Sequence, residues 1–407
     1  MQKIRLVFSC IERGNFNGAP KNIYRLIEGI NRERIEPVLI STSENILTNK
    51  LSKIGIRVII VPIPNEINVY EKKLLKFSFS NFIKILKGIY KYQKSLAIII
   101  KDLNVDVFWC ENIRNLIMSF YILRKSKIKI IWNVWSEGTN RIISKLIHLF
   151  GLFIADEINF EYFGQKNKIF GFMGNGIKLF KKNVFTVLYS GVTNFEDITG
   201  SNIRKELGIN KTDVILLMAS DIYLPKGQYD LLQTFKIILK HTNKLHLLLA
   251  GRPQIGLVGS QNYYNDIKEY INTYKLYNNV HLLGWRDDMP DLFYHSDIYV
   301  STSYGEGLPD SVREAMKYSK PVVATDVGGT SELITNDLNG YLFEPGDCES
   351  LSELLLKLIE NEPLRKKMGI SGKRIINEKF SNKAYVLKFE KMIIDCVNRN
   401  SKHHLNS

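Results

Sequence analysis

The stretch Glu306-Gly307-Leu308-Pro309-Asp310-Ser311-Val312-Arg313-Glu314-Ala315 places one carboxylate in a turn and a second in a helix. Gly307 permits unusual backbone angles and Pro309 suits a first helical position, so a helix is predicted to start near Pro309. Glu306 and Glu314 then lie about one or two helical turns apart. That separation is too large for sharing a proton, and we expect the two carboxylates to hold two parts of one long ligand.

Residues 308–311, all of which except Pro309 carry a backbone N–H group, lie between these carboxylates in the sequence. The first N–H groups of a helix have no partner within the helix and bind anions such as phosphate. The stretch is therefore predicted to hold a ligand that carries both hydroxyls and phosphate. Taken alone, it is also compatible with an ordinary helix start that carries two solvated acids.

The flanking sequence makes the pattern specific. Gly284–Pro290 and His295–Ser303 precede it, and Lys320–Gly329 and Asn339-Gly340 follow it. In this order and spacing the chain resembles the retaining glycosyltransferases of the GT-B fold, the large family 4 (glycosyl transferases group 1), with their Glu-X7-Glu signature and its Glu-Gly-Leu-Pro opening. Residues 204–375 resemble the donor-binding domain of that family.

The resemblance implies an α/β protein of the GT-B fold, with two Rossmann-like parallel-sheet domains facing across a cleft. Residues 1–193 are expected to form an N-terminal acceptor-binding domain, and residues 194–203 the interdomain linker. Residues 204–375 are expected to form the nucleotide-sugar donor-binding domain. Residues 376–407 are expected to contain a C-terminal helix that returns to the N-terminal domain, followed by a disordered tail.

Apolar runs along the chain independently favour two α/β halves, because short β-branched runs alternate with helical patterns such as Lys21–Asn31. The predicted strands of the first half are Ile4–Phe8, Pro37–Ile40, Val58–Val61, Val105–Trp109 and Ile128–Val134. Those of the second half are Val214–Ala219, Leu245–Ala250, Val280–Leu283, Ile298–Ser301, Pro321–Ala324 and Gly340–Phe343.

Lys226 lies just before Gly227, which opens a helix after the predicted strand Val214–Ala219. A lysine there can serve as a point charge for phosphate, although a solvated surface lysine has the same local pattern. Many members of the resembled family carry an Arg five residues earlier, where this chain has Asp221. Either another cation such as Arg252 or Arg286 replaces that arginine, or the backbone carries more of the interaction.

By resemblance, Glu314 holds the ribose hydroxyls, Glu306 the donor sugar and Lys226 the diphosphate, while the backbone near Trp285 and Arg286 meets the base. Glu306 and Lys226 are the candidate catalytic residues. In this family, front-face attack aided by the leaving phosphate is the usual proposal, so catalysis would rest on positioning and charge stabilisation. The full set of candidate substrate-binding residues is Gly18, Ser220, Arg252, Trp285, Arg286, Gly307, Leu308, Pro309 and Glu314.

Two loops of the first half bear on the same site. Residues 10–20 follow the first strand and open a helix, and the matching loop of the resembled family closes on the donor phosphates with a Gly-Gly pair. This chain has Gly18-Ala19, so Gly18 is a candidate donor contact or simply a turn glycine. After the strand Ile128–Val134, many relatives carry a His near the sugar, where this chain has Asn133 or Trp135.

Composition is that of an ordinary globular protein, because 407 residues with 45% hydrophobic and 24% charged side chains suffice for about two domains. No apolar run approaches a membrane span and the first ten residues read as a strand, so a cytoplasmic location is expected. The four cysteines have no C-x-x-C spacing, the histidines have no ligand spacing and Asp-X-Asp is absent. A metal-independent reaction without a cofactor is therefore expected.

The net charge of +15 belongs to the first half, since residues 1–193 carry a net +16 and residues 194–407 a net −1. Residues 71–102 interleave eight lysines with aromatic and aliphatic residues. Such a stretch can lie on an anionic membrane, which would place the protein on the inner face of the cytoplasmic membrane, or it can be a helix with a solvated basic face. No nucleic-acid-binding motif accompanies the charge.

The resemblance implies a retaining glycosyltransferase that moves a sugar from a nucleotide-diphosphate donor to a hydroxyl acceptor. A lipid-linked glycan in cell-surface polysaccharide biosynthesis is the expected acceptor, as is common in the resembled family. A sugar-nucleotide epimerase or hydrolase on the same scaffold is the first alternative. A catalytically silent nucleotide-sugar-binding partner is the second, because Asp221 stands where a cation is usual.

Overall fold

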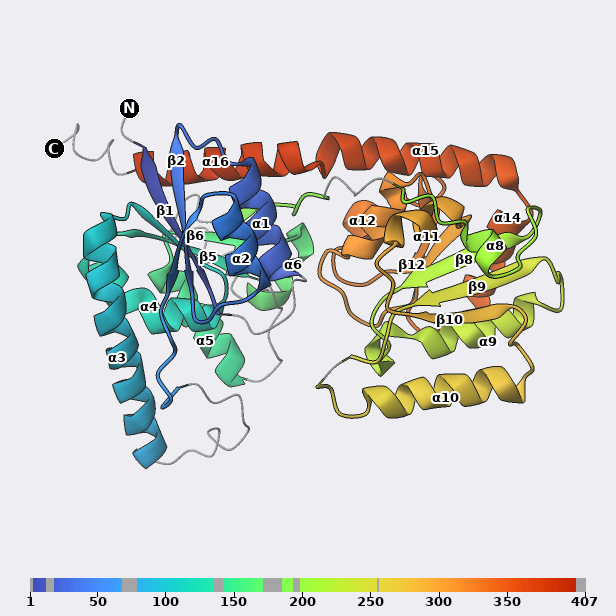
Figure 1. The fold of residues 1–407 in the computed structure, drawn as a ribbon, viewed down its shortest axis with the longest axis horizontal. Coiled ribbons are helices and arrows are strands. Elements are labelled where there is room, and N and C mark those ends of the chain that lie inside the picture. The colour runs from blue at the N-terminus through green and yellow to red at the C-terminus, as the bar shows by residue number, and fades with distance from the viewer. Residues whose placement is uncertain are drawn as a thin grey trace. The chain divides into compact units, whose positions relative to one another are not determined.

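The computed structural model describes residues 3–11, 18–67, 79–134, 142–170, 185–192, 198–254 and 256–399. The chain divides into two compact units, each with its own sheet (Figure 1). The first unit is Met1–Gly191 together with Asn382–Ser407, and the second is Val192–Ser381. The C-terminal helix α16 (Asn382–Asn398) therefore belongs to the first unit.

In the described part of the first unit, parallel strands form one sheet in the order β3-β2-β1-β4-β5-β6-β7. Most of these strands are buried on both faces, which explains their continuous apolar runs. The strands are β1 (Ile4–Cys10), β2 (Ile35–Ser41), β3 (Arg57–Ile60), β4 (Val107–Cys110), β5 (Lys129–Val134), β6 (Glu157–Phe160) and β7 (Phe185–Val187).

Helices cover both faces of this sheet. Packed on one face are α3 (Phe79–Leu103), α4 (Ile113–Lys125), α5 (Ile142–Ile154) and α6 (Phe163–Phe170). On the other face lie α1 (Ala19–Gly29), α2 (Ile46–Lys53) and α16. The α16 ring of Phe389 packs on Phe8 and Trp109, with centroids 5.8 and 5.2 Å away, which anchors the last helix to the first unit.

The second unit has a parallel sheet in the order β10-β9-β8-β11-β12-β13. Its strands are β8 (Val214–Ala219), β9 (Leu245–Ala250), β10 (Val280–Gly284), β11 (Ile298–Ser301), β12 (Val322–Thr325) and β13 (Gly340–Phe343). One face packs against α9 (Gln228–Ile238), α10 (Ser260–Thr273) and α14 (Cys348–Ile359). Figure 1 shows α8 (Ile203–Glu206), α11 (Met289–His295) and α12 (Asp310–Lys317) on the opposite face. The remaining elements are η2 (Leu224–Lys226), α13 (Thr330–Leu333) and α15 (Glu362–Lys379).

This architecture confirms the predicted α/β class with two Rossmann-like parallel sheets. Every predicted strand is present, but the sequence prediction missed β6 and β7, because β6 contains Glu157 and Asn159 and β7 is only three residues long. The motif helix α12 begins at Asp310, with Pro309 as its N-cap, close to the predicted start. In both sheets the strand order reverses beside the first strand, between β1 and β4 and between β8 and β11.

Candidate functional site

The candidate residues of the second unit gather where its strand order reverses. Ligands of open parallel sheets bind at the carboxyl ends of the strands at such a point. Ser220 follows β8, and the segment from Thr302 to Glu306 follows β11, which is paired with β8. Topology therefore places the two predicted segments side by side, although 80 residues separate them.

Lys226 and Glu306 form an ion pair in which Lys226 Nζ donates to Glu306 Oε1 over 2.6 Å. Their side chains are 18% and 15% exposed. Opposite charges this well removed from water interact more strongly than a surface pair. The structure thus brings the two predicted catalytic residues together. Each side chain stays partly exposed, so a ligand can contact it and replace its partner in the ion pair.

Thr302 fixes the loop that carries Lys226. Its hydroxyl Oγ1 donates to the carbonyl oxygens of Lys226 and Gly227, at 3.1 and 2.8 Å. Tyr304 N donates to the Pro225 carbonyl over 2.8 Å. Gly227 has φ +69°, and a Cβ there would lie 2.1 Å from the Thr302 carbonyl oxygen. Only glycine therefore permits this approach of the two loops.

The loop that carries Glu306 is held by the turn after β12. Gly329 N donates to the Gly307 carbonyl over 2.7 Å, and a Cβ on Gly328 would lie 1.8 Å from the Glu306 carbonyl oxygen. Arg313, 1% exposed, donates to the Leu308 carbonyl over 3.3 Å from inside the helix. The backbone of the motif is therefore fixed on two sides.

Glu314 extends from α12 and is half-buried. Tyr299, buried below it on β11, donates through its hydroxyl to the Ala219 carbonyl over 3.2 Å. Burial, together with the nearby negative charges of Glu306 and Glu314, raises the pKa of Tyr299. Both carboxylates of the motif therefore contribute to the electrostatic environment of the Tyr299 hydroxyl.

Ser220 and Asp221 are positioned by Gln228 at the start of α9. Gln228 Nε2 donates to Ser220 Oγ over 3.1 Å and to the Asp221 carbonyl over 2.9 Å. A Cβ on Gly251, after β9, would lie 1.8 Å from the Ser220 carbonyl oxygen. As in the Lys226 loop, a glycine permits a close backbone contact that fixes the segment. The sequence prediction did not include Gln228 and Gly251 among the site residues.

This chain has Asp221 where the resembled family often has an arginine, and Arg252 and Arg286 are the two cations that could replace it. The structure distinguishes between them. Arg286 donates to Glu206 over 2.7 and 3.0 Å and to Asp288 over 2.7 and 2.6 Å, and these two carboxylates raise its pKa. Its charge is therefore already balanced by two carboxylates. The Arg252 guanidinium instead lies 4.7 Å from the centroid of the Trp285 ring, and no carboxylate pairs with it within the described residues. Arg252 is the better candidate cation.

In the first unit, Gly18 is exposed, has φ +56° and forms the N-cap of α1. Residues 12–17 and Trp135 lie outside the described residues. Asn133 is buried at the end of β5, where its Nδ2 donates to Glu111 Oε1 over 3.2 Å and its Oδ1 accepts from Asn159 over 2.6 Å. The sequence prediction missed this row of hydrogen-bonded polar side chains. A polar residue at the end of each of the adjacent strands would have indicated it.

The remaining predictions concern a metal ion and the membrane. No group of three or more His, Cys, Asp or Glu side chains suited to a metal ion was found among the described residues. In the same part of the chain, no helix is both long and apolar enough to cross a membrane. Residues 71–78, the first part of the predicted basic stretch, lie outside it.

The chain is similar to several known glycosyltransferases. Residues 200–375 match the family described as glycosyl transferases group 1. The chain is 26% identical over 359 residues to an N,N'-diacetylbacillosaminyl-diphospho-undecaprenol alpha-1,3-N-acetylgalactosaminyltransferase of Campylobacter jejuni, covering 82% of this chain and 85% of the relative. It is 27% identical over 263 residues to the capsular polysaccharide biosynthesis glycosyltransferase CapM of Staphylococcus aureus, covering 63% of this chain and 66% of that protein.

Other curated relatives match mainly through one part, and the chain spans about half of their length. Among solved structures, HepE of Anabaena in complex with UDP is similar with a TM-score of 0.78 at 18% identity. That match covers 96% of this chain and 100% of HepE. Over residues 200–375 the chain is therefore similar to the glycosyl transferases group 1, and its fold is GT-B.

Proposed function

We propose that this protein is a retaining glycosyltransferase of family 4 that transfers a sugar from a nucleotide-diphosphate donor to a hydroxyl acceptor. The observation that carries the proposal is the ion pair between Lys226 and Glu306 at the reversal of strand order, with Glu314 on the adjacent helix. A cation for phosphate and two carboxylates for hydroxyls match the three parts of a nucleotide sugar.

The geometry suggests how each residue acts. When the donor binds, its phosphate oxygens replace Glu306 as partners of Lys226, and Glu306 then accepts hydrogen bonds from the donor sugar. Glu314 accepts from the ribose hydroxyls. As the glycosidic bond to phosphate breaks, Lys226 stabilises the charge that grows on the leaving diphosphate. The proton of the acceptor hydroxyl passes to that phosphate as the new bond forms on the same face of the sugar.

We propose that the reaction needs no bound metal. Lys226, Arg252 and the N–H groups at the start of α12 together supply the positive charge that a cation would otherwise bring to the diphosphate. Asp221 adds a negative charge to the same region, and Arg252 offsets it. The backbone around Trp285 and Arg286 meets the base, and Gly18 stays a candidate donor contact.

The donor and acceptor classes follow from the relatives. HepE was solved with UDP, so a UDP-sugar is the first donor to test. The name of the Campylobacter jejuni relative specifies a diphospho-undecaprenol acceptor, and CapM acts in capsular polysaccharide biosynthesis. We therefore propose a lipid-linked glycan acceptor in cell-surface polysaccharide biosynthesis.

We propose that the protein works on the cytoplasmic face of the membrane, where it would meet a lipid-linked acceptor. One layer of the first unit has suitable chemistry. Helix α3 exposes Lys84, Lys87 and Lys94 together with Tyr90, which is 70% exposed. Anionic headgroups attract such lysines, while aromatic side chains favour the membrane interface.

Helix α5, in the same layer, adds an apolar stripe. Leu146, Phe150 and Phe153 are 58%, 44% and 68% exposed at positions i, i+4 and i+7, so they lie along one side of the helix. Exposed apolar residues in a row are costly in water unless they meet another surface. We propose that α3 and α5 together dock on an anionic membrane.

Thermal unfolding against a panel of nucleotide sugars, followed by transfer assays with the best donor, tests this function. A specific nucleotide sugar should raise the unfolding temperature, because a ligand stabilises the state it binds. The product formed with a polyprenyl-diphosphate glycan should keep the anomeric configuration of the donor. Donor turnover without acceptor would indicate the hydrolase or epimerase, and donor binding without any turnover would indicate the silent partner.

A further inference from the structure

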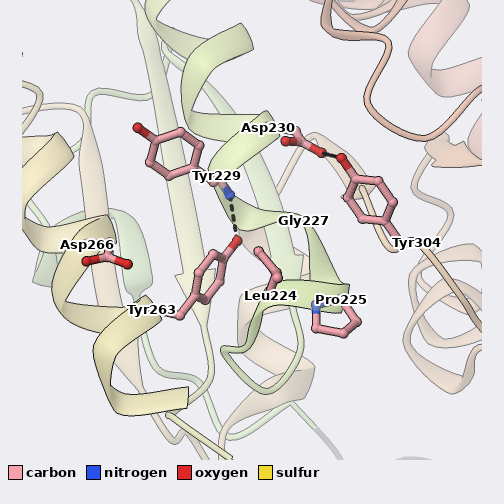
Figure 2. A pocket seen from close by; sticks show the side chains of 8 residues that line it. All are labelled: Leu224, Pro225, Gly227, Tyr229, Asp230, Tyr263, Asp266 and Tyr304. Carbon is pink, nitrogen blue, oxygen red and sulfur yellow. Dashed lines mark hydrogen bonds between the residues drawn. The ribbon is translucent and has the colours of Figure 1, made fainter. Parts of the chain in front are cut away.

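A pocket of about 670 Å³ in the second unit lies beside the candidate donor site, yet contains none of its catalytic residues. Its volume lies within the range of about 300–1,000 Å³ that is usual for small-molecule sites. We call it the tyrosine pocket, and the residues that line it are Leu224, Pro225, Gly227, Tyr229, Asp230, Tyr263, Asp266 and Tyr304 (Figure 2).

One wall of the tyrosine pocket consists of the loops that hold the catalytic pair. Leu224 and Pro225 precede Lys226, and Tyr304 lies two residues before Glu306. The backbone hydrogen bond from Tyr304 N to the Pro225 carbonyl joins these two loops. Lys226 and Glu306 meet each other, whereas Leu224, Pro225 and Tyr304 line the pocket.

The opposite wall comes from α9 and α10. Tyr263 of α10 is 8% exposed, and its hydroxyl oxygen accepts a hydrogen bond from Tyr229 N over 3.0 Å. That bond uses the oxygen and leaves the hydroxyl proton available to a ligand. Figure 2 shows Asp266 on one side of Tyr263, and Asp230 with Tyr304 on the other.

Asp230 is already oriented, because Tyr304 donates its hydroxyl to Asp230 Oδ2 over 2.7 Å. This hydrogen bond to the carboxylate raises the pKa of Tyr304 to about 12. The other carboxylate oxygen of Asp230 and both oxygens of Asp266 can accept from a ligand. The pocket thus offers carboxylate acceptors on two sides and a phenol donor between them.

The lining excludes anions, because its charged residues are two aspartates and neither a lysine nor an arginine lines it. A phosphate, and hence the donor diphosphate, is repelled. A sugar ring fits, because its C–H faces pack against tyrosine rings and against Leu224 while its hydroxyls donate to carboxylates. Hydrogen bonds from neutral hydroxyls to a carboxylate are stronger than those between neutral groups.

We propose that the tyrosine pocket is a second carbohydrate subsite, which binds a neutral sugar residue of the glycan on which the enzyme works. The identity of the ligand rests on the glycosyltransferase function proposed above. Occupancy would also stiffen the Tyr304–Pro225 contact and so hold Lys226 in place. A glycan bound in this pocket would therefore be recognised by the enzyme and would also stabilise the loop that carries Lys226.

Saturation-transfer NMR with the full-length protein tests the pocket directly, without donor and without turnover. The probes are methyl glucoside, methyl galactoside and N-acetylglucosamine, each at millimolar concentration, with glucosamine as a cationic comparison. At least one neutral sugar should bind. The substitution Asp266→Asn should weaken that binding about tenfold, because it removes a charged acceptor.

Glu269→Gln is the matched control, because Glu269 is an exposed carboxylate on the same helix that does not line the pocket. It should bind the sugar as the unmodified protein does, and both variants should keep its unfolding temperature and its affinity for UDP. Glu306→Gln should also retain sugar binding, since Glu306 lies outside the pocket.

Three results would overturn the proposal. The first is loss of sugar binding in Glu306→Gln but not in Asp266→Asn, which would assign the signal to the donor sugar position. The second is preferential binding of glucosamine, which would make the pocket a cation site. The third is absence of sugar binding altogether. Because none of these readouts uses transfer activity, the pocket can fail while the proposed glycosyltransferase stands, and the reverse also holds.

Discussion

The two units share one strand order around their first strand but use the carboxyl ends of their strands differently. In the second unit, Lys226 and Glu306 at the reversal point keep 18% and 15% of their side chains exposed, and their loops are held by glycine contacts. In the first unit, Glu111, Asn133 and Asn159 at the corresponding strand ends are buried and bonded to one another. The same scaffold thus gives an open ligand site in one unit and a closed polar network in the other.

Charge separates the units as clearly as burial does. The second unit neutralises its charges locally, as Arg286 does with Glu206 and Asp288. The first unit leaves most of its excess lysines exposed, as on α3. This difference is consistent with the two proposals above, in which the second unit binds a small charged ligand and the first meets an extended anionic surface.

The strongest test of the open site is Glu306→Gln. We expect it to lower kcat for transfer at least about 100-fold, because the neutral amide neither pairs with Lys226 nor accepts strongly from the donor sugar. Steady-state kinetics with the best donor measure the effect. Near-normal turnover would refute the assignment.

Glu314→Ala is the companion variant and should mainly weaken donor binding, because Glu314 is assigned to the ribose and not to the reacting bond. Calorimetric titration with the nucleotide diphosphate measures it. The two variants should differ in kind, one in rate and the other in affinity. Both should keep the unfolding temperature close to that of the unmodified protein, and a large drop would show a structural role instead.

The basic surface of the first unit gives the next largest effect. Changing Lys84, Lys87, Lys91 and Lys94 to Glu should remove most binding to anionic vesicles, at roughly 1 kcal/mol per lysine. Lys91 already pairs with Glu66, so we expect it to contribute least of the four. Co-sedimentation at rising ionic strength measures the loss, since salt screens surface charge.

A control with the same change in charge is available in the second unit, where Lys205, Lys211, Lys240 and Lys244 are exposed. Their replacement by Glu should leave vesicle binding much closer to that of the unmodified protein. Neither variant should alter donor affinity. Equal loss in both would show that total charge matters and not the α3 surface. Unchanged sedimentation of the α3 variant would refute docking.

Two glycines with nearly the same backbone angle test whether the contact between the Lys226 loop and Thr302 matters. Gly227 and Gly208 have φ +69° and +68°, but only at Gly227 would a Cβ meet the Thr302 carbonyl oxygen, whereas space is open at Gly208. Alanine at either position costs about 1–2 kcal/mol of backbone strain. Gly227→Ala should cost more and also weaken donor binding, because the Lys226 loop must move.

Thermal unfolding and titration with UDP measure both variants. Gly208→Ala should lower the unfolding temperature but leave nucleotide affinity unchanged. If the two variants behave alike in both measurements, then the close contact with Thr302 does not position Lys226.

Much of this difference between the units could be predicted from the sequence. The remaining features could not, because they depend on contacts between residues that are far apart in the chain. Strands with continuous apolar runs were found, and the motif placed Glu306 and Glu314 on one turn and helix. The pairing of Arg286 with Glu206 joins residues 80 positions apart through tertiary structure, so no local pattern reveals it. Tyr229, Tyr263 and Tyr304 each resemble ordinary core residues, and only the fold brings them around one pocket.

A smaller effect concerns pH and the far edge of the second sheet. Burial, and after it the neighbouring His246, whose Nδ1 lies 3.2 Å from His281 Nε2, lower the pKa of His281 to about 4. The unfolded chain takes up this proton near pH 6.5, whereas the folded chain does so only near pH 4. The free energy of unfolding should therefore fall as the pH drops from 6.5 toward 4.

We expect a loss of about 1 kcal/mol after allowance for solvent screening of a half-buried group. Thermal unfolding at pH 7 and pH 5 measures it, and His281→Phe should flatten the difference. The exposed His241→Asn is the control and should show the same pH dependence as the unmodified protein. An identical drop in His281→Phe would assign the pH dependence to other groups.

The smallest expected effect is that of EDTA on transfer, and it bears directly on how the open site balances charge. If Lys226, Arg252 and the start of α12 neutralise the diphosphate, chelation should leave kcat/KM within about twofold of its value, well under 1 kcal/mol. Asp221→Arg adds a cation at this position, so it should raise donor affinity and stay insensitive to EDTA. Activity that EDTA removes and manganese restores in the unmodified protein, but not in Asp221→Arg, would show instead that Asp221 recruits a metal ion to the donor. In that case a metal ion, and not Arg252, would balance the charge of the diphosphate. The roles proposed for Glu306 and Glu314 would not change.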